Sequence, residues 1–382
     1  MNKSFFKIGF IGGAINSAVG TVHTIASQMD GKFKLVAGCF SKNLDTNRDT
    51  GKQWNIDPQR VYDNWETMLI QEKDLLDAIV ILTPTPDHCY MIEKAIMLGH
   101  AVISEKSLTK SVDEAKQLKK IIDTKNGFLT VTYNYTGYPV IRELKQRILN
   151  GELGKINQIL IEMPQEGFIR IGQDGKPIVP QNWRLKDYEI PTISLDLGVH
   201  VYNLINFLTG EDAFEVCAVE NSYGNYKEII DDIHAIATFS NGIICNIWFS
   251  KSALGYRNGL RIRIFGNEGS AEWIQCNPEE LIINNKIGEK KIVIRGQNDL
   301  LLLNIPRYNR FKSGHPAGFI EAFANLYTDI YEALYTYKYS SKQNYQNNYT
   351  FGINDALKGL LFLTAMHISF NEKKWVKVEN IP

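Results

Sequence analysis

The chain begins with a short apolar strand that runs directly into a glycine-rich turn. Strand and turn read Lys7-Ile8-Gly9-Phe10-Ile11-Gly12-Gly13, and the turn continues through Gly20 into a helix-like segment. A strand, a glycine turn and a helix in this order let backbone N–H groups at the helix N-terminus approach a phosphate group. The same order also occurs as a plain strand–helix connection in α/β proteins. Because Ala14 and Asn16 stand where glycine often occurs, the rest of the chain has to decide between these interpretations.

The residues after this turn alternate between short apolar runs and helix-like segments. The clearest helix starts at Ser111, which forms a capping box with Glu114, and it ends before Gly127. The apolar runs predict five buried strands: Ile8–Ile11, Leu35–Phe40, Ala78–Leu82, Ala101–Ser104 and Leu129–Thr132. Repeated strand–helix units of this kind predict a doubly wound parallel sheet that binds a nucleotide. Residues 1–132 are therefore expected to form a dinucleotide-binding Rossmann domain.

The pattern changes after residue 133, where strands begin to follow one another. A loop-rich stretch covers 164–191, and Ser240-Asn241-Gly242 reads as a hairpin turn. Helices are predicted at Val140–Leu149, Ser194–Leu208, Phe319–Tyr335 and Asn354–His367, and strands at Ile156–Glu162, Phe214–Val219, His234–Phe239, Ile243–Phe249, Leu260–Phe265 and Ala271–Gln275. Residues 133–382 are therefore expected to form an α+β domain with a mainly antiparallel sheet, which binds substrate and supports oligomerisation.

Composition excludes several classes of partner. The chain has 382 residues with 42 basic and 42 acidic side chains, so no basic surplus indicates nucleic-acid binding. No run approaches the roughly 18 apolar residues of a membrane span. The five cysteines are scattered without CxxC spacing, and no set of residues has metal-ligand spacing. We therefore expect a cytoplasmic protein that acts on a small molecule without a metal.

Residues that follow the predicted strands of the first domain are candidates for cofactor contacts, because ligands bind at the carboxyl ends of parallel strands. Ser41 and Lys42 follow the second strand in place of the carboxylate that would bind the ribose of NAD, which tilts the expectation toward NADP. Both residues also fit a solvated loop. After the next strand comes a Thr-Pro-Thr-Pro-Asp-His run, in which Thr83, Pro84, Thr85 and His88 are candidates; a simple helix cap fits this run equally well.

Two further elements point to proton transfer. Glu105 and Lys106 end the fourth strand, where a partly buried lysine can hydrogen-bond a substrate hydroxyl and act as acid or base. Asp196 and His200 lie four residues apart, on one face of a helix, and Gly198 between them would permit close approach of a ligand. A nucleotide site with a Lys/Asp/His set favours hydride transfer to or from an alcohol. A surface lysine and a structural histidine are the alternatives.

Together these residues resemble the Gfo/Idh/MocA family of oxidoreductases, which includes glucose–fructose oxidoreductase and inositol dehydrogenase. The resemblance covers essentially the whole chain. The family's Glu-Lys-Pro motif reads Glu105-Lys106-Ser107 here, and the Asp-x-Gly-x-His element is intact from Asp196 to His200. Trp183-Arg184 resembles the family pair near the nicotinamide end of the cofactor.

The resemblance implies a Rossmann domain that binds NAD or NADP and a second domain whose open sheet forms the interface of a dimer or tetramer. It also implies a polyol, sugar, inositol or nucleotide-sugar substrate. Lys106 and His200 would then handle the hydroxyl proton, and Asp196 would hold the substrate. Gly12, Gly13, Ala14, Asn16 and Glu105 join the cofactor candidates above, and the expected substrate shell comprises Tyr133, Asn134, Gln165, Arg184 and His315.

Three functions stay open at this point. The first is a dehydrogenase that acts on a sugar, inositol or sugar derivative. The second is a redox-neutral enzyme, an epimerase or an oxidative glycoside-cleaving enzyme, that retains its cofactor. The third is a non-catalytic dinucleotide sensor. Basic residues in the loops 164–191 and 307–318 hint at an anionic substrate, although they also fit a solvated surface: Arg170, Lys176, Arg184, Lys186, Arg307, Arg310 and Lys312.

Overall fold

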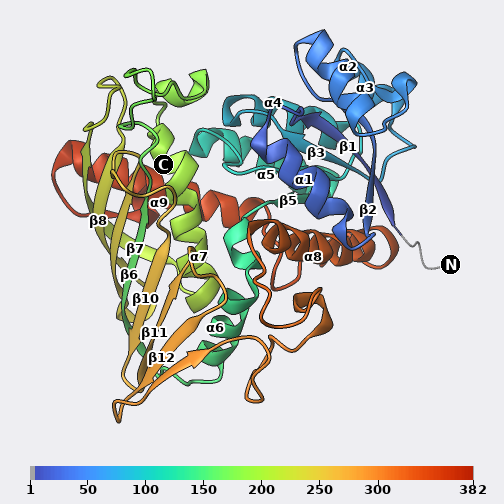
Figure 1. Ribbon diagram of the computed structural model, residues 1–382. Helices are drawn as coiled ribbons and strands as arrows, with labels where there is room; N and C mark the ends of the chain where they lie inside the picture. The colour runs from blue at the N-terminus through green and yellow to red at the C-terminus, as the bar shows by residue number, and fades with distance from the viewer. Residues whose placement is uncertain (1–4, 382) are drawn as a thin grey trace. The chain divides into compact units, whose positions relative to one another are not determined.

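The computed structural model describes residues 5–381, and the chain divides into two compact units (Figure 1). Unit 1 consists of Met1–Gly137 and Phe319–Leu357, and unit 2 of Tyr138–Gly318 and Lys358–Pro382. The first boundary lies close to the one that the sequence predicts between residues 132 and 133. The second unit differs from the prediction, because a long C-terminal segment returns to unit 1.

Unit 1 contains a five-stranded parallel sheet in the order β2-β1-β3-β4-β5. The strands are β1 (Phe6–Gly12), β2 (Phe33–Cys39), β3 (Ala78–Leu82), β4 (Val102–Ser104) and β5 (Leu129–Val131). All five lie at the predicted places. Their side chains are almost entirely buried, because helices cover both faces of a parallel sheet.

The helices of unit 1 come from both parts of its chain. They are α1 (Ala18–Met29), α2 (Leu44–Gln53), α3 (Trp65–Gln71), α4 (Thr85–Met97), α5 (Val112–Lys125) and α8 (Phe319–Tyr339), with 3-10 turns at Pro58–Arg60 and Asn134–Gly137. On one face of the sheet, Phe6 and Phe10 share a buried cluster with Tyr327 of α8. On the other face, a Cβ added to Gly9 would lie 2.4 Å from the Met68 side chain of α3. Helix α8 is therefore part of the core of unit 1.

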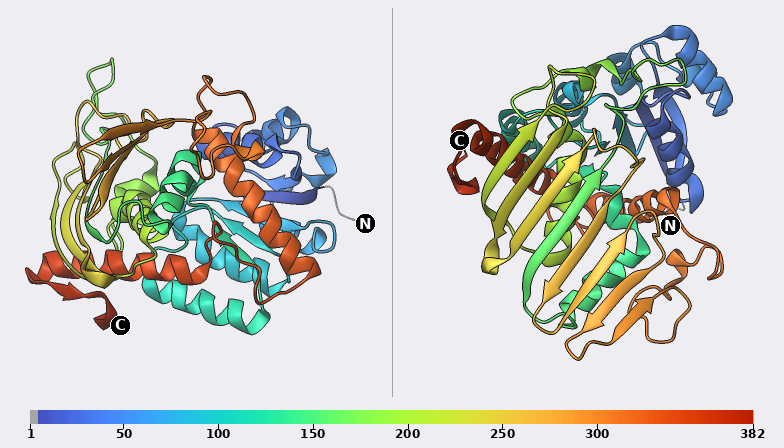
Figure 2. Two further views of the ribbon diagram at one scale, coloured as in Figure 1. Left: turned by 90° about the horizontal axis from the view of Figure 1, so that it is seen from below. Right: turned by 60° about the vertical axis from the view of Figure 1, so that its left-hand side comes forward.

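Unit 2 is built on a nine-stranded sheet in the order β13-β12-β11-β10-β6-β9-β8-β7-β14 (Figure 2). Its strands are β6 (Ile156–Pro164), β7 (Ala213–Asn221), β8 (Asp232–Phe239), β9 (Ile244–Ser250), β10 (Arg261–Gly266), β11 (Gly269–Ile274), β12 (Leu281–Asn285), β13 (Lys290–Val293) and β14 (Val376–Lys377). The predicted turn at Ser240–Gly242 joins β8 to β9. Every neighbouring pair is antiparallel except β6 and β9, which run parallel. The predicted α/β and α+β folds are thus confirmed.

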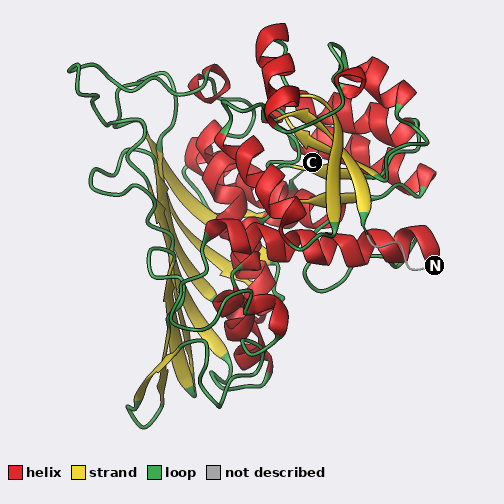
Figure 3. Cartoon of the chain, turned by 45° about the vertical axis from the view of Figure 1, so that its right-hand side comes forward, coloured by secondary structure: helices red, strands yellow, loops and turns green. Residues whose placement is uncertain are grey.

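Helices cover one face of this sheet (Figure 3). They are α6 (Pro139–Leu149), α7 (Val199–Thr209) with the π-helical turn Ser194–Gly198 before it, and α9 (Ile353–Glu372), which starts in unit 1 and continues in unit 2. Short 3-10 turns occupy Asn182–Leu185, Ser240–Gly242, Pro306–Tyr308 and Val378–Asn380. Burial alternates along β8 and β9, as expected for a sheet with one covered face.

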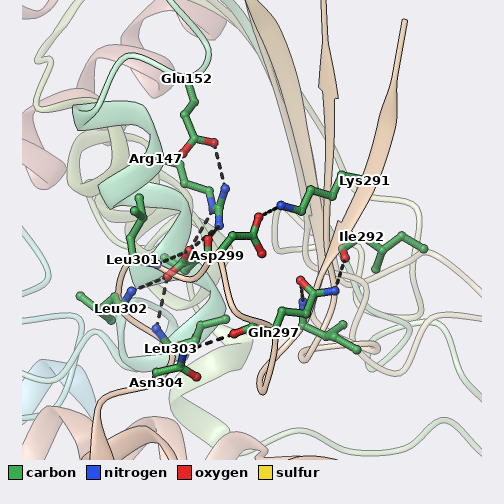
Figure 4. A network of polar contacts seen from close by, with 12 residues as sticks. Arg147, Glu152, Lys291, Ile292, Gln297, Asp299, Leu301, Leu302, Leu303 and Asn304 are labelled. Carbon is green, nitrogen blue, oxygen red and sulfur yellow. Dashed lines mark hydrogen bonds and ion pairs between the residues drawn. The ribbon is translucent and has the colours of Figure 1, made fainter.

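The loop after β13 is held to α6 by a buried carboxylate. Glu143 is 0% exposed and accepts hydrogen bonds from the backbone N–H groups of Leu301, Leu302 and Leu303 at 3.0, 2.7 and 3.2 Å. Arg147, one turn further along α6, donates to Glu143 at 2.9 Å and to the Asp299 carbonyl at 2.9 Å (Figure 4). This pairing compensates the cost of burying a charge and holds the segment 299–303, which precedes the predicted substrate loop 307–318.

Candidate functional site

The glycine turn of unit 1 has a geometry that only glycine satisfies. Gly12 and Gly13 have φ angles of 81° and 75°, which L-residues with a side chain rarely adopt. A Cβ on Gly20 would lie 1.9 Å from the Gly13 carbonyl oxygen, so α1 packs directly on the turn. Ser17 caps α1 by accepting from the Gly20 N–H at 3.3 Å. Of the two residues that depart from glycine, Ala14 is buried and Asn16 is exposed.

The parallel pairing brings the predicted residues of unit 1 to one edge of the sheet. Gly12 pairs with Leu82, and a Cβ on Gly12 would lie 2.9 Å from the Thr83 methyl group. Ser104 pairs with Ile81 on one side and with Val131 on the other. The glycine turn, Thr83, Lys106 and Tyr133 therefore all follow strands that end at the same edge, where ligands of such sheets bind.

The backbone that follows β2 is held by the side-chain amide of Asn47, and not by a carboxylate. Asn47 Oδ1 accepts hydrogen bonds from the Phe40 and Ser41 N–H groups at 2.7 and 3.4 Å. The Lys42 side chain is 88% exposed, and its Nζ lies 3.5 Å from Asp87 Oδ2 in α4. The carboxylate that would bind a ribose is absent directly after β2, and the Lys42 ammonium group lies beside the first turn of α4.

His88 is a buried link between two of the loops at this edge. Its Nε2 lies 2.7 Å from the Thr83 carbonyl oxygen and its Nδ1 2.8 Å from the Ser107 carbonyl oxygen. Burial lowers the pKa of the His88 imidazole below its ordinary value, although both carbonyl groups counteract this effect. Because His88 is 0% exposed, it ties the Thr83 loop to the Lys106–Ser107 segment from inside the protein. Thr85 is also buried, in the first turn of α4.

Glu105 belongs to a buried polar network that holds the segment of Lys106. His23 Nε2 lies 3.0 Å from Glu105 Oε1, and His23 Nδ1 lies 2.6 Å from the Tyr327 hydroxyl of α8. Thr132, directly after β5, donates to the same carboxylate oxygen. Burial alone would raise the pKa of the Glu105 carboxyl, but His23, Lys106 and Thr132 outweigh it, and the pKa lies below its ordinary value. The network joins α1, β4, β5 and α8 beneath the half-buried Lys106.

Tyr133 and Asn134 follow β5 and are almost completely buried. The Tyr133 ring makes an edge-on contact with Phe351 at 5.6 Å, and burial raises the pKa of its hydroxyl above the ordinary value. Asn134 is 3% exposed at the start of a 3-10 turn. Their predicted contact with substrate stays a prediction.

In unit 2, Asp196 and His200 lie on consecutive helical turns as the sequence predicts. Asp196 belongs to the π-helical turn and His200 to the first turn of α7, and they are 5% and 6% exposed. The expected role of Gly198 is corrected. A Cβ on Gly198 would lie 2.7 Å from the Leu363 side chain and 3.1 Å from the Phe249 ring, so this glycine permits close packing of the helix rather than the approach of a ligand.

Two cations meet on the Asp196 carboxylate. Arg184 Nε and Lys251 Nζ lie 3.0 and 2.6 Å from its Oδ2. Lys251 Nζ also lies 3.4 Å from Gln165 Oε1. Sequence reasoning identified Gln165, Arg184 and Asp196 but missed Lys251. The missing signal was the parallel pairing of β6 and β9, which matches Pro164 with Ser250 and so makes the residues after these strands neighbours.

The remaining predicted residues of unit 2 lie in two different loops. The Arg184 guanidinium stacks on the Trp183 ring at 4.4 Å, and Gln181 Oε1 accepts from Trp183 at 3.0 Å and from Arg184 at 2.5 Å. His315 is exposed, and its carbonyl oxygen accepts from Arg295 at 2.7 Å. The contacts of its loop are thus with the β13 region, whereas Trp183 belongs to the Asp196 cluster.

Metal sites, membrane spans and cysteines were also considered in the sequence, and the structure describes residues 5–381 for them. In this range no group of three or more His, Cys, Asp or Glu side chains is arranged to hold a metal ion, and no helix combines the length and apolarity of a membrane span. The five cysteines are free thiols.

Comparisons with known proteins cover both units. Residues 6–133 match the protein family described as "Oxidoreductase family, NAD-binding Rossmann fold". Residues 141–272 match the family described as "GFO/IDH/MocA C-terminal domain". The oxidoreductase YfiI of Bacillus subtilis is 28% identical over 327 residues, which cover 82% of each chain. The scyllo-inositol 2-dehydrogenase (NAD(+)) of the same organism is 26% identical over 57% of this chain and 58% of its own length.

A similar solved structure is that of an inositol dehydrogenase homolog from Azotobacter vinelandii complexed with NADH and myo-inositol. It superposes with a TM-score of 0.87 at 25% identity and covers 98% of both chains. The likeness thus extends from the glycine turn of unit 1 to the nine-stranded sheet of unit 2. The chain belongs to the Gfo/Idh/MocA family of oxidoreductases, with an NAD-binding Rossmann domain.

Proposed function

We propose that the protein is an NAD(P)-dependent dehydrogenase that transfers hydride between the nicotinamide and a secondary hydroxyl of a sugar, inositol or sugar derivative. The observation that carries this proposal is the common edge of unit 1, where the glycine turn follows β1, Lys106 follows β4 and a buried network fixes Glu105. The names of the similar inositol dehydrogenases support the substrate class.

The residues of unit 1 fit a dinucleotide. A Cβ on Gly12, Gly13 or Gly20 would collide with Thr83, Leu82 or the turn's own backbone, so these glycines allow β1, the turn and α1 to pack tightly. Such a tight turn before a helix N-terminus is the arrangement that binds a pyrophosphate. Ala14, Asn16, Thr83, Pro84 and Thr85 complete the proposed cradle. When bound, the nicotinamide accepts or donates the hydride. Trp183 and Arg184 are proposed to contact its nicotinamide end, and His88 to act on the cradle through the loops that it joins.

The chain's own residues supply proton handling and orientation. We propose that Lys106 hydrogen-bonds the reacting hydroxyl, and that His200 takes its proton during oxidation and returns it during reduction. Asp196 is engaged by Arg184 and Lys251, so it acts by fixing these cations and the π-helical turn that carries it. Gln165, Tyr133, Asn134 and His315 are proposed substrate-shell residues.

For the cofactor, we propose acceptance of NADP through Ser41 and Lys42. The support is the absence of an acid directly after β2 and the exposure of the Lys42 ammonium group, which suits a 2′-phosphate.

We also propose a homo-oligomer that forms through the uncovered face of the nine-stranded sheet. This face carries a hollow of about 510 Å³ lined by Leu160, Cys217, Val219, His234, Ile236, Asn246, Trp248, Arg263 and Trp375, among others. Val219, Ile236 and Trp375 are 54%, 47% and 46% exposed. Clustered apolar side chains of this kind are typical of surfaces that bind another protein.

Cofactor binding by the purified protein is the first test of the proposed function. NAD(H) and NADP(H) are titrated by calorimetry, any copurifying cofactor is identified, and a panel of sugars, inositols and sugar acids is screened for NAD(P)H formation. Exchangeable cofactor with turnover of a polyol is the expected result. A retained cofactor that turns over without free NAD(P) would indicate the redox-neutral alternative, and binding without any turnover would favour a sensor. Failure to bind either cofactor would contradict the proposal.

A further inference from the structure

The loops that follow β6 and β9 in unit 2 bring several charged side chains together. Because β6 and β9 run parallel, the chain leaves both strands at the same edge of the sheet. The Gln165 N–H donates to the Ser250 carbonyl at 2.7 Å, and the Ala253 N–H donates to the Gln165 carbonyl at 2.9 Å. The two loops therefore form one surface, to which Arg184 and Asp196 are added from the following segments.

The ion pairs on this surface join four cations to two carboxylates, and we call these six residues the cationic cluster: Glu166, Arg170, Arg184, Asp196, Lys251 and Arg257. Arg170 and Arg257 approach Glu166 Oε1 at 3.3 and 2.8 Å, and Glu166 Oε2 accepts from the Gly255 N–H at 3.0 Å. The Gly255 hydrogen bond and the two arginines lower the pKa of the Glu166 carboxyl below its ordinary value. Both carboxylates of the cluster thus bind two cations each.

Two acids of the neighbouring segments, Asp187 and Asp231, are hydrogen-bonded to backbone N–H groups rather than ion-paired with the cations of the cluster. Asp187 accepts from the backbone N–H groups of Thr192 and Ile230, at 2.7 and 2.8 Å. Asp231 accepts from the backbone N–H groups of Tyr223 and Gly224, at 2.9 and 2.7 Å. These two carboxylates serve to hold loops, as their backbone partners indicate.

The two cations on Asp196 are arranged to bind an oxyanion. The Lys251 side chain is 10% exposed and the Arg184 side chain 26% exposed, so both interact in a partly dehydrated setting where charge interactions are strong. The Trp183 ring adds a cation–π contact to the guanidinium at 4.4 Å. Arginine carries five N–H donors, and the contacts with Asp196 and Gln181 leave donors of this planar fork for a carboxylate or phosphate.

We propose that the cationic cluster binds an anionic group, a carboxylate or a phosphate, on the sugar or polyol substrate, with Lys251 and Arg184 as its direct contacts. This inference rests on the proposed dehydrogenase function and makes its substrate class narrower. It also distinguishes among the basic loop residues that, in the sequence, hint at an anionic substrate. Arg170 and Arg184 belong to the cluster, whereas Lys176 is exposed beside a turn of the same loop.

The test compares anionic substrates with their neutral parents on the cofactor-loaded enzyme. The sets are glucose with glucuronate and glucose 6-phosphate, galactose with galacturonate, and myo-inositol with its 1-phosphate. We expect at least one anion to exceed its neutral parent about tenfold in kcat/KM, with a preference that weakens as salt rises. Lys251→Met should reduce this ratio about tenfold, and the matched control Lys176→Met should leave it unchanged. Preference for the carboxylate or for the phosphate identifies the source of the anionic group.

Several results would overturn the inference and leave the dehydrogenase function intact. They are turnover of neutral polyols with no anion preference, a ratio that Lys251→Met does not change, and a Lys251→Met effect confined to the choice between NADP and NAD. Arg257→Met provides a second variant that should fold normally, because this side chain is 81% exposed, and it should reduce the ratio about threefold. If nothing in the panel is oxidised, the proposed function fails. In that case, calorimetric titration with glucuronate and inorganic phosphate tests the anion site by itself. If Lys251→Met does not weaken the binding of these anions, the inference is overturned too.

Discussion

The sheets of the two units arrange their functional residues in opposite ways. In unit 1, all five strands run parallel, so the residues that follow β1, β3, β4 and β5 collect at one edge. In unit 2, neighbouring strands mostly alternate in direction, and their ends point to opposite edges. Asp196 and His200 of unit 2 come instead from a helical segment, and only β6 and β9 bring two strand ends together.

Because the two sheets differ in this way, the residues of the candidate site in unit 1 could be predicted from the sequence, whereas those in unit 2 could be predicted only in part. In a parallel sheet, the residues that follow the strands lie at the same edge whatever the order of the strands is. A mixed sheet does so only for its parallel pairs, which the sequence does not mark. If the comparison is right, unit 1 supplies the cofactor site and Lys106, and unit 2 supplies substrate contacts. Variants at Lys106 and at His200 should then both lower kcat while cofactor affinity is retained.

The largest expected effect is that of Lys106→Ala. Loss of the ammonium group removes the proposed proton partner of the reacting hydroxyl, so kcat should fall about 10³-fold, within the range typical of general acid–base groups. Cofactor affinity should change less than threefold in calorimetric titration, and Lys120→Ala, an exposed lysine of α5, should behave like the wild type. Appreciable activity in Lys106→Ala would remove this lysine from the mechanism.

The counterpart in unit 2 is His200→Ala. We expect about a 10²-fold loss of kcat, because the proton can still leave through water while Lys106 is present. The pH profile of kcat should lose the limb that belongs to the imidazole, whereas cofactor affinity should stay the same. Should His200→Ala instead weaken NAD(P) binding as much as turnover, the division of roles between the two units would be wrong.

Much of the fold was predictable, for reasons that particular segments make clear. The β-strands of unit 1 were found because continuous apolar runs such as Ala78–Leu82 alternate with capped helices. Strands β12 to β14 were missed because they are short and carry many polar residues. The packing of α8 in unit 1 was not predicted, because the apolar periodicity of this helix shows only that one of its faces is buried. Its partner, the sheet face with Phe6 and Phe10, is more than 300 residues away in the chain.

The candidate site was predictable where a residue follows a parallel strand or belongs to a local spacing. Lys106, Asp196 and His200 meet these conditions. Lys251 does not, because a lysine at the end of an apparently antiparallel strand looks like a solvated residue. The network of His23, Glu105 and Tyr327 was also out of reach, since it joins three elements that are distant in sequence.

The uncovered face of the unit 2 sheet gives a prediction of intermediate size. Ile236→Lys places a charge in the apolar hollow, and it should weaken the proposed oligomer at least tenfold, which corresponds to about 1.4 kcal/mol. Light scattering over a concentration series measures the change. Val179→Lys is the matched control, because Val179 is equally apolar and 72% exposed in a loop away from the sheet. A protein that is monomeric before mutation would contradict the assignment of this face.

The smallest expected effects are opposite pH dependences of stability in the two units. In unit 1, the pKa of Glu105 is lowered, so its contribution is complete above the unfolded value of about 4.3 and is lost as pH falls through the folded pKa. In unit 2, the hydrogen bond to Glu220 raises the pKa of His367. Its contribution is therefore complete below the unfolded value of about 6.5 and is lost as pH rises through the folded pKa.

Thermal unfolding of Glu105→Gln and His367→Gln at pH 3, 4, 6, 7 and 9 measures these contributions. His367→Gln should cost about 1 to 2 kcal/mol at pH 6 and much less at pH 9, because charge-assisted hydrogen bonds contribute in this range only while the imidazole is protonated. Glu105→Gln should cost a similar amount or more from pH 7 down to about pH 4.3, and progressively less as pH falls below this value. If both variants lost stability equally at every pH, the two carboxylates would hold their partners by packing rather than by charge, and the contrast between the units would be one of topology alone.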